Sequence, residues 1–276
     1  ANSPQNIFIP GDSNYLFYED NVFTISTVAG ASSGLIQYGQ FSCRLMFRYN
    51  TITLNIPSYS LFEMHGCQPG SGMDSCFGGE IYGNQVTTNN NSLTFFKTRS
   101  GKTFVFFNNA DKSTPATLAA YTGTTSDPCP VNNAENKVIN NNYWFNNRIN
   151  LKGAFFKDSA SADLDCAGLK GIPTLGRDVF SNNTTPGVSC GTLENLPANC
   201  ITGQGYWATN QSCSNLTNMV GKNPATPISG VLYKCTSPNT WTPYYTPYTY
   251  PHPLRQASGT DSTNPPKPPM NLKIVQ

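Results

Sequence analysis

The sequence predicts an all-β protein built as a solenoid, in which short strands and turns stack coil upon coil. Three observations carry this prediction. A phrase recurs through the first half, that half has little helical periodicity, and its short apolar runs are separated by loops rich in Gly, Asn and Pro. One short β-run with its turn cannot bury its apolar side alone, so copies of it must stack on one another.

The recurring phrase is a run of apolar or aromatic residues that leads into an asparagine. Asparagine tolerates the left-handed backbone of a tight bend, and its amide can hydrogen-bond to the amides of the coils above and below. The alternative is chance placement in an asparagine-rich sequence, but the flanking apolar pattern recurs as well. We therefore predict a stacked asparagine ladder. Its five members are Asn21, Asn50, Asn84, Asn108 and Asn146.

Three segments follow from this pattern. Residues 1–157 carry the phrases and are predicted to form the coils of the solenoid. Residues 158–256 lose the pattern and are rich in aromatic residues and cysteine, which predicts an irregular flank or cap. An open coil end requires such a cap because it exposes unpaired strand groups and apolar core. Residues 257–276 form a linker rich in Pro, Ser and Thr, followed by a β-capable tip.

The C-terminal tip is a candidate for assembly between subunits. A short strand on a linker can add to the sheet edge of a neighbouring subunit, which would make a homopolymer. The alternative is a frayed terminus. The candidate residues are Asn271, Leu272, Lys273, Ile274 and Val275.

Residues 241–254 combine many aromatic side chains with several prolines. The prolines exclude a helix or a central strand, so this segment is expected to lie extended across a surface. Its aromatic residues have two interpretations. They clamp the segment onto the chain's own coils, which we favour, or they stack on sugar rings. They are Trp241, Tyr244, Tyr245, Tyr248 and Tyr250.

Composition excludes some classes of partner. Charged residues make up 12% of the chain, with 17 Lys+Arg against 15 Asp+Glu. This balance gives no strong field for nucleic acid or an anionic membrane. No apolar run of the length needed to span a bilayer occurs, so membrane insertion is not expected. The abundance of neutral polar residues is common in secreted proteins, and we expect an extracellular or cell-surface location.

The nine cysteines also favour an oxidising environment. None of them forms a C-x-x-C pair, which argues against zinc, and no metal or cofactor is expected. Short intervals around loops suggest disulfides, and the odd number leaves at least one thiol free or paired between chains. The candidate pairs are Cys67 with Cys76, Cys190 with Cys200, and Cys213 with Cys235.

Two sets of residues resemble a known family. The asparagine phrases and the sequence Tyr-Thr-Pro-Tyr-Thr-Tyr-Pro-His-Pro-Leu at 245–254 are similar to bacterial right-handed parallel β-helix proteins of the pectate-lyase-like superfamily. The similarity includes residues 62–66 and 80–84 and covers most of residues 15–254. It implies secretion, a right-handed parallel β-helix with three faces, and the C-terminal portion of a longer solenoid. That superfamily contains lyases, hydrolases, adhesins and structural proteins, so the fold does not fix the function.

A calcium-dependent polysaccharide lyase needs several carboxylates on one face and a nearby base. Glu19 and Asp20 are adjacent, so strand geometry puts them on opposite faces. Glu63 and Glu80 converge only if their coils are in a favourable register. Asp74 lies in a loop between two cysteines. These positions give no convincing cluster.

An inverting glycosidase needs two close carboxylates. Asp163 and Asp165 lie outside the repeats, where a solvated loop is the simpler explanation. His65 and His252 are interpreted as structural. We therefore expect no catalytic residues and a non-catalytic extracellular scaffold that assembles into a surface fibre or filament. The alternative is a polysaccharide lyase or hydrolase, or a carbohydrate-binding β-helix module.

Overall fold

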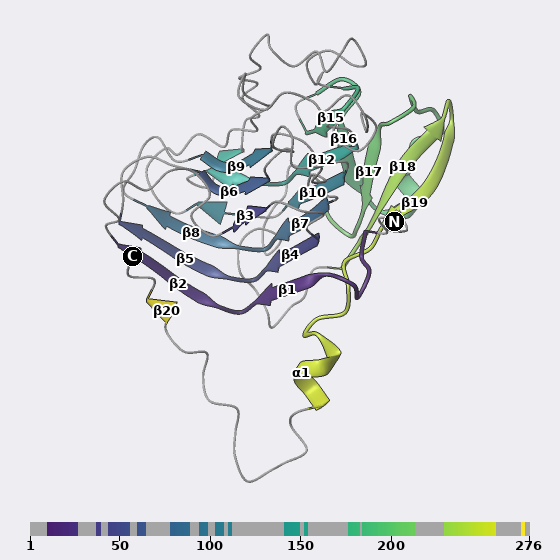
Figure 1. Cartoon of the computed structure of the whole chain (residues 1–276). Coiled ribbons are helices and arrows are strands. Elements are labelled where there is room, and N and C mark those ends of the chain that lie inside the picture. Colours follow the sequence, from purple (N-terminus) through teal and green to yellow (C-terminus); the bar gives the residue numbers. More distant parts are fainter. Residues whose placement is uncertain are drawn as a thin grey trace, which may run out of the picture.

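The structure is a computed structural model of the chain (Figure 1). Strands dominate, and helix in the described part of the chain is limited to α1 (Pro253–Ala257) and a 3-10 turn (Leu193–Asn195). The all-β prediction is therefore confirmed. No described helix has the length and apolar character needed to cross a membrane. The residues that the structure describes are 10–26, 37–39, 44–55, 60–64, 78–88, 94–98, 103–107, 110–111, 141–149, 152–153, 176–182, 184–212, 229–257 and 272–273.

One sheet contains six parallel strands, and each neighbour in it comes from a different part of the chain. Its last strand extends the sheet beyond residue 157, where we expected the coils to end. In spatial order the strands are β1 (Leu16–Glu19), β4 (Arg44–Arg48), β7 (Gly78–Tyr82), β10 (Thr103–Phe107), β12 (Asn142–Phe145) and β15 (Val179–Ser181).

Two further sheets are built from the segments that follow these strands. The second contains β2 (Val22–Ser26), β5 (Thr51–Asn55), β8 (Gln85–Thr88), β11 (Ala110–Asp111) and β13 (Arg148–Ile149), all parallel. Its two edges are β14 (Lys152–Gly153), which is antiparallel to β13, and β20 (Leu272–Lys273), which is parallel to β2. The third sheet contains β3 (Gln37–Gly39), β6 (Ser60–Met64) and β9 (Thr94–Thr98).

The chain visits these sheets in a repeating order. β1, β2 and β3 lie in the first, second and third sheet, and β4–β6 and β7–β9 repeat that order. Figure 1 shows β1–β2, β4–β5 and β7–β8 as successive layers. The register aligns equivalent positions of the recurring phrase, so that Glu19 pairs with Arg48 and Arg48 with Tyr82.

A residue with a left-handed backbone makes the bend between the first and second sheets. The angle φ is 60° at Asp20, 58° at Tyr49 and 66° at Gly83. We expected the asparagine of each phrase to adopt this conformation, but at these three corners the residue before it does so. The conformation costs about 1–2 kcal/mol for a residue other than glycine. The packing around Asp20 and Tyr49 must therefore stabilise their bends.

The region expected to be irregular contains a fourth sheet. It consists of β16 (Val188–Gly191), β17 (Gly205–Ala208), β18 (Val231–Ser237) and β19 (Thr240–Tyr245), in that order. Pro243 lies in β19 at the edge of the sheet, where its missing N–H disrupts no central ladder. The prolines are therefore compatible with an edge strand. The expectation that residues 158–256 are irregular was wrong for the four strands of this sheet.

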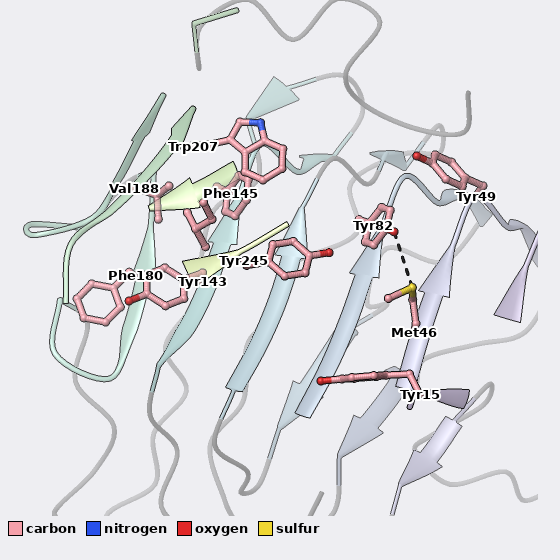
Figure 2. Close-up of a cluster of buried hydrophobic side chains, with 11 residues drawn as sticks. Tyr15, Met46, Tyr49, Tyr82, Tyr143, Phe145, Phe180, Val188, Trp207 and Tyr245 are labelled. Carbon is pink, nitrogen blue, oxygen red and sulfur yellow. Dashed lines mark hydrogen bonds between the residues drawn. The ribbon is translucent and has the colours of Figure 1, made fainter. Parts of the chain in front are cut away.

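Strands β4, β7 and β12 of the six-stranded sheet are buried on both faces. Phe47 of β4 stacks on Phe23 of β2 with ring centroids 5.5 Å apart, and it meets Phe62 of β6 at 4.8 Å. Side chains on this face therefore point towards the other two sheets. The opposite face carries Met46, Tyr82, Tyr143 and Phe145. They belong to one buried cluster with residues of the fourth sheet, including Trp207 and Tyr245 (Figure 2).

Candidate functional site

The end of β19 and the segment that follows it cross the outer face of the six-stranded sheet. We name residues 244–257 the tail, and the face that it covers on β1, β4 and β7 the tail face. The ring of Phe17 lies 5.4 Å from that of Tyr248 and 4.4 Å from that of His252. The tail thus packs on the chain's own sheet, as the favoured interpretation of its aromatic residues predicted. The tail face has two aligned rows: Phe17, Met46 and Glu80, and Glu19, Arg48 and Tyr82.

Arg48 is the centre of this interface. Its side chain is fully buried and donates from Nε to Oε2 of Glu19 over 2.8 Å. Nη1 donates to the hydroxyl of Tyr82 over 2.9 Å and to the carbonyl of Tyr248 over 2.5 Å. Nη2 donates to the carbonyl of Thr249 over 2.9 Å. One guanidinium therefore joins β1, β4, β7 and the tail.

The carboxylates of Glu19 and Asp20 bind the rest of the tail. Oε1 of Glu19 accepts from the backbone N–H of His252 and from Arg255, each over 2.9 Å. Oδ2 of Asp20 accepts from Arg255 over 2.7 Å and from the hydroxyl of Tyr250 over 2.5 Å. Two of the acidic residues that we considered as calcium ligands, Glu19 and Asp20, are therefore engaged by the tail.

These contacts shift the pKa values of the pair. Burial acts to raise the pKa of Glu19, but hydrogen bonds from His252, Arg255 and Arg48 lower it below its ordinary value. Burial acts to lower the pKa of Arg48, but Tyr82 and Glu19 raise it above its ordinary value. The pair is therefore held in its charged form.

Glu80 is a second buried carboxyl group under the tail, and it forms no such ion pair with another described residue. Its Oε1 accepts from the backbone N–H of Gly11 over 2.7 Å. Oε2 is buried and makes no hydrogen bond of normal geometry, although the hydroxyl of Tyr245 is close enough to lower the pKa of the carboxyl group. Burial outweighs these contacts and raises the pKa of Glu80 to about 7.

The asparagines of the first three phrases are hydrogen-bonded to one another. The backbone N–H and the amide of Asn21 donate to Oδ1 of Asn50 over 2.9 and 3.0 Å. Those of Asn50 donate to Oδ1 of Asn84 over the same distances. The amides also reach backwards, from Asn50 to the carbonyl of Tyr18 and from Asn84 to that of Phe47. Each corner therefore donates to the asparagine of the next coil, and the asparagine of that next coil donates back to a carbonyl of the preceding one.

The later corners differ from the predicted ladder. Asn108 lies outside the described residues. Asn146 has φ of 56° and so takes the place of the bending residue, which leaves Asn147 in the ladder position. The phrase ends in two asparagines there, and we chose the first of them. The backbone N–H of Asn146 donates to Oδ1 of Asn182 over 2.7 Å, a contact that the five-phrase pattern did not include.

The predicted disulfide pairs need correction. Cys200 bonds to Cys235, with an S–S distance of 2.06 Å, so the pairs Cys190–Cys200 and Cys213–Cys235 are wrong. β18 brings Cys235 beside the loop that follows the 3-10 turn, and short sequence intervals gave no sign of this pairing. Cys190 is also disulfide-bonded, to a cysteine outside the described residues. Cys67, Cys76 and Cys213 lie outside them as well.

The predicted assembly tip lies at an edge of this chain's own second sheet. Leu272 and Lys273 form β20, in register with Phe23 and Thr24 of β2. Asn271, Ile274 and Val275 lie outside the described residues. In this single chain the tip therefore occupies the kind of edge that we expected it to find on a neighbour.

The remaining candidate groups do not form a described catalytic cluster. Within the described ranges no group of three or more His, Cys, Asp or Glu side chains is arranged to hold a metal ion. His252 packs against Phe17 and Tyr248. His65, Asp74, Asp163, Asp165 and the side chain of Glu63 lie outside the described part.

Sequence reasoning did not identify the role of Arg48. The available signal was its position, since Phe17-Tyr18-Glu19 and Met46-Phe47-Arg48 are equivalent parts of two phrases. Opposite charges at the same place in stacked repeats predict a cross-strand pair. Aromatic residues also surround the charge: the guanidinium carbon lies 5.3 Å from the ring centres of both Phe17 and Tyr250, where cation–π attraction stabilises it.

Replacing Arg48 with methionine is expected to destabilise the protein strongly. It leaves Glu19 and two tail carbonyls without their buried partner, and breaking a buried pair costs about 3–5 kcal/mol. Arg177→Met is the comparison, because the Arg177 side chain is 49% exposed although its partner Asp178 is 2% exposed, so a smaller loss is expected than for the fully buried Arg48. Urea unfolding measures both variants. Equal losses would contradict a central role for Arg48.

The unfolding free energy is expected to fall as pH rises from about 5 to 7. The pKa of Glu80 is raised from 4.5 to about 7 in the folded state, so over this range the folded protein holds a proton that the unfolded chain releases. The loss over this range amounts to about 2 kcal/mol. Glu80→Gln should remove this slope while keeping an acceptor for Gly11. Parallel pH profiles for the two proteins would disprove the assignment.

Asn50→Ala should destabilise the protein more than Asn21→Ala. The first change removes a fully buried amide and strands groups on both neighbouring corners, at about 1–3 kcal/mol for each unsatisfied group. The second removes contacts on one side only. Denaturant midpoints of the two variants test the order, and a larger effect at Asn21 would be inconsistent with the described bonding.

Comparisons with models of protein families, with curated protein sequences and with solved structures found no match. The tail face, the asparagine contacts and the edge carrying β20 are therefore the features of this chain from which we infer a function.

Proposed function

We propose that the chain is a non-catalytic structural module of a secreted parallel β-helix. The repeating visit to three sheets, with parallel pairing and aligned corners, supports the β-helix. The disulfides support an oxidising, extracellular environment. On this proposal the right-handed coil and its pectate-lyase-like ancestry remain inferences from the sequence resemblance.

One observation carries the structural function: the acidic and basic groups of the tail face are buried, and Glu19 and Arg48 hold the tail. The side chain of Arg48 is fully buried and that of Glu19 is 3% exposed. Glu80 is also completely buried. A polysaccharide-cleaving carboxylate must contact its substrate. Because the tail covers these groups, they are not accessible to a polysaccharide, which favours a scaffold over a lyase or hydrolase.

We further propose that the module self-associates through exchange of β20. In one chain β20 pairs with β2 of the same chain. The same parallel pairing to β2 of a neighbour makes identical backbone hydrogen bonds, which is the basis of strand exchange between subunits. Repeated exchange links subunits into a fibre, whereas pairing within one chain leaves a monomer.

Sedimentation velocity and electron microscopy of the non-reduced protein test this proposal. The native protein is expected to form oligomers or filaments as its concentration rises, and Leu272→Pro should prevent this because proline removes a backbone donor from the added strand. Leu272→Ala is the matched control and should still assemble. Native protein that stays monomeric, or equal assembly by the proline variant, would refute the exchange.

A separate assay tests the non-catalytic part. The protein should release no unsaturated uronate product from polygalacturonate or alginate, with or without Ca²⁺. Release that tracks the purified protein would overturn the scaffold assignment in favour of a polysaccharide lyase.

A further inference from the structure

We propose that the edge formed by β1 and Asn21, which no described strand pairs with on its outer side, is a docking site for one more parallel coil, an extended strand with an asparagine at its corner. This inference rests on the proposed β-helix. It begins at a different edge from the one through which β20 is exchanged, since β1 ends the first sheet, but the second strand of the added coil would take the place of β20 on β2.

The directional asparagine contacts specify what this edge lacks. Asn50 accepts at Oδ1 from the corner above and also donates to the carbonyl of Tyr18 in that same run of chain. Asn21 makes only the bonds directed towards Asn50, to which its backbone N–H and amide donate. Its amide also donates to the carbonyl of Glu19 in its own strand. Among the described residues no donor reaches its Oδ1. An incoming asparagine amide and a backbone carbonyl would complete the pattern.

Exposure of apolar side chains marks the same edge. Leu16 and Leu45 are paired in register and are the same residue type, yet Leu45 is 1% exposed and Leu16 is 56% exposed. Val22, just beyond the corner, is 42% exposed. A strand stacked on β1 would cover Leu16 as β1 covers Leu45, with the burial of apolar area as the driving force.

The second sheet shows that this side of the fold accepts a parallel strand. β20 lies on the outer edge of β2, with Leu272 aligned with Phe23. The next coil on the other side places Ile52 against the same residue. β20 therefore occupies half of the position that a complete added coil would take, and it must leave before the second strand of such a coil can pair with β2.

Charge selects among possible coils. The residue aligned with Glu19 in the added strand would lie beside an acidic pair, Glu19 and Asp20, that already binds Arg255. A further acidic residue there would be repelled, whereas a basic residue would be attracted. The chain's own segment from Arg44 to Asn55 meets each requirement, with Leu45, Arg48 and Asn50 at the positions facing Leu16, Glu19 and Asn21.

A labelled peptide with the sequence of residues 44–55 is the probe, measured by fluorescence anisotropy against the full-length protein. The peptide is expected to bind, and its Asn50→Ala form to bind about tenfold more weakly. Protein carrying Leu272→Pro should bind the native peptide more tightly than the native protein does, since β20 no longer competes. Asn21→Ala protein should lose the preference for asparagine, once circular dichroism shows that it is folded.

Equal binding of the two peptides to the native and Leu272→Pro proteins would overturn the inference, as would no binding to either. These outcomes are separable from failure of the proposed function. Self-association depends on β20 and is read by sedimentation without any peptide, so a chain that forms filaments but ignores the peptide keeps the first proposal and loses the second.

Discussion

The buried guanidinium of Arg48 requires hydrogen-bond acceptors, and three separate parts of the chain supply them. A charge removed from water is tolerated only when it is paired and fully hydrogen-bonded. Glu19 supplies the carboxylate from the adjacent strand, Tyr82 a hydroxyl from the strand on the other side, and the tail two backbone carbonyls. The position of the tail is therefore fixed by the need to satisfy this group.

The parallel register makes this arrangement possible. Equivalent residues of successive phrases lie side by side, so a difference between two copies of the phrase becomes a contact between them. Glutamate in the first copy, arginine in the second and tyrosine in the third form one continuous row. Alternation along each strand keeps that row on the outer face, while Phe47 and its neighbours fill the space between the three sheets.

Recurrence in the sequence was enough to predict the strands, the all-β class and the contacting asparagines at 21, 50 and 84. It was not enough to place the last corner, because Asn146 and Asn147 fit the phrase equally well and only the backbone angle distinguishes them. Cys235 could not be assigned to Cys200 from spacing, since their approach depends on the fourth sheet. Burial of Glu80 was also hidden, because it results from Gly11 and the tail rather than from its own strand.

The tail has a consequence for the order of folding. Its contacts with Arg48, Glu19 and Asp20 join residues separated by 200 to 236 positions, whereas neighbouring corners are separated by 29 and 34. Contacts that close long loops form late, after nearer ones have reduced the entropy of the chain. During synthesis, a nascent chain that has not yet produced the tail holds an arginine and a glutamate on an uncovered apolar sheet. Such an intermediate is prone to mispairing, and appearance of the tail marks the point at which it becomes protected from aggregation and proteases.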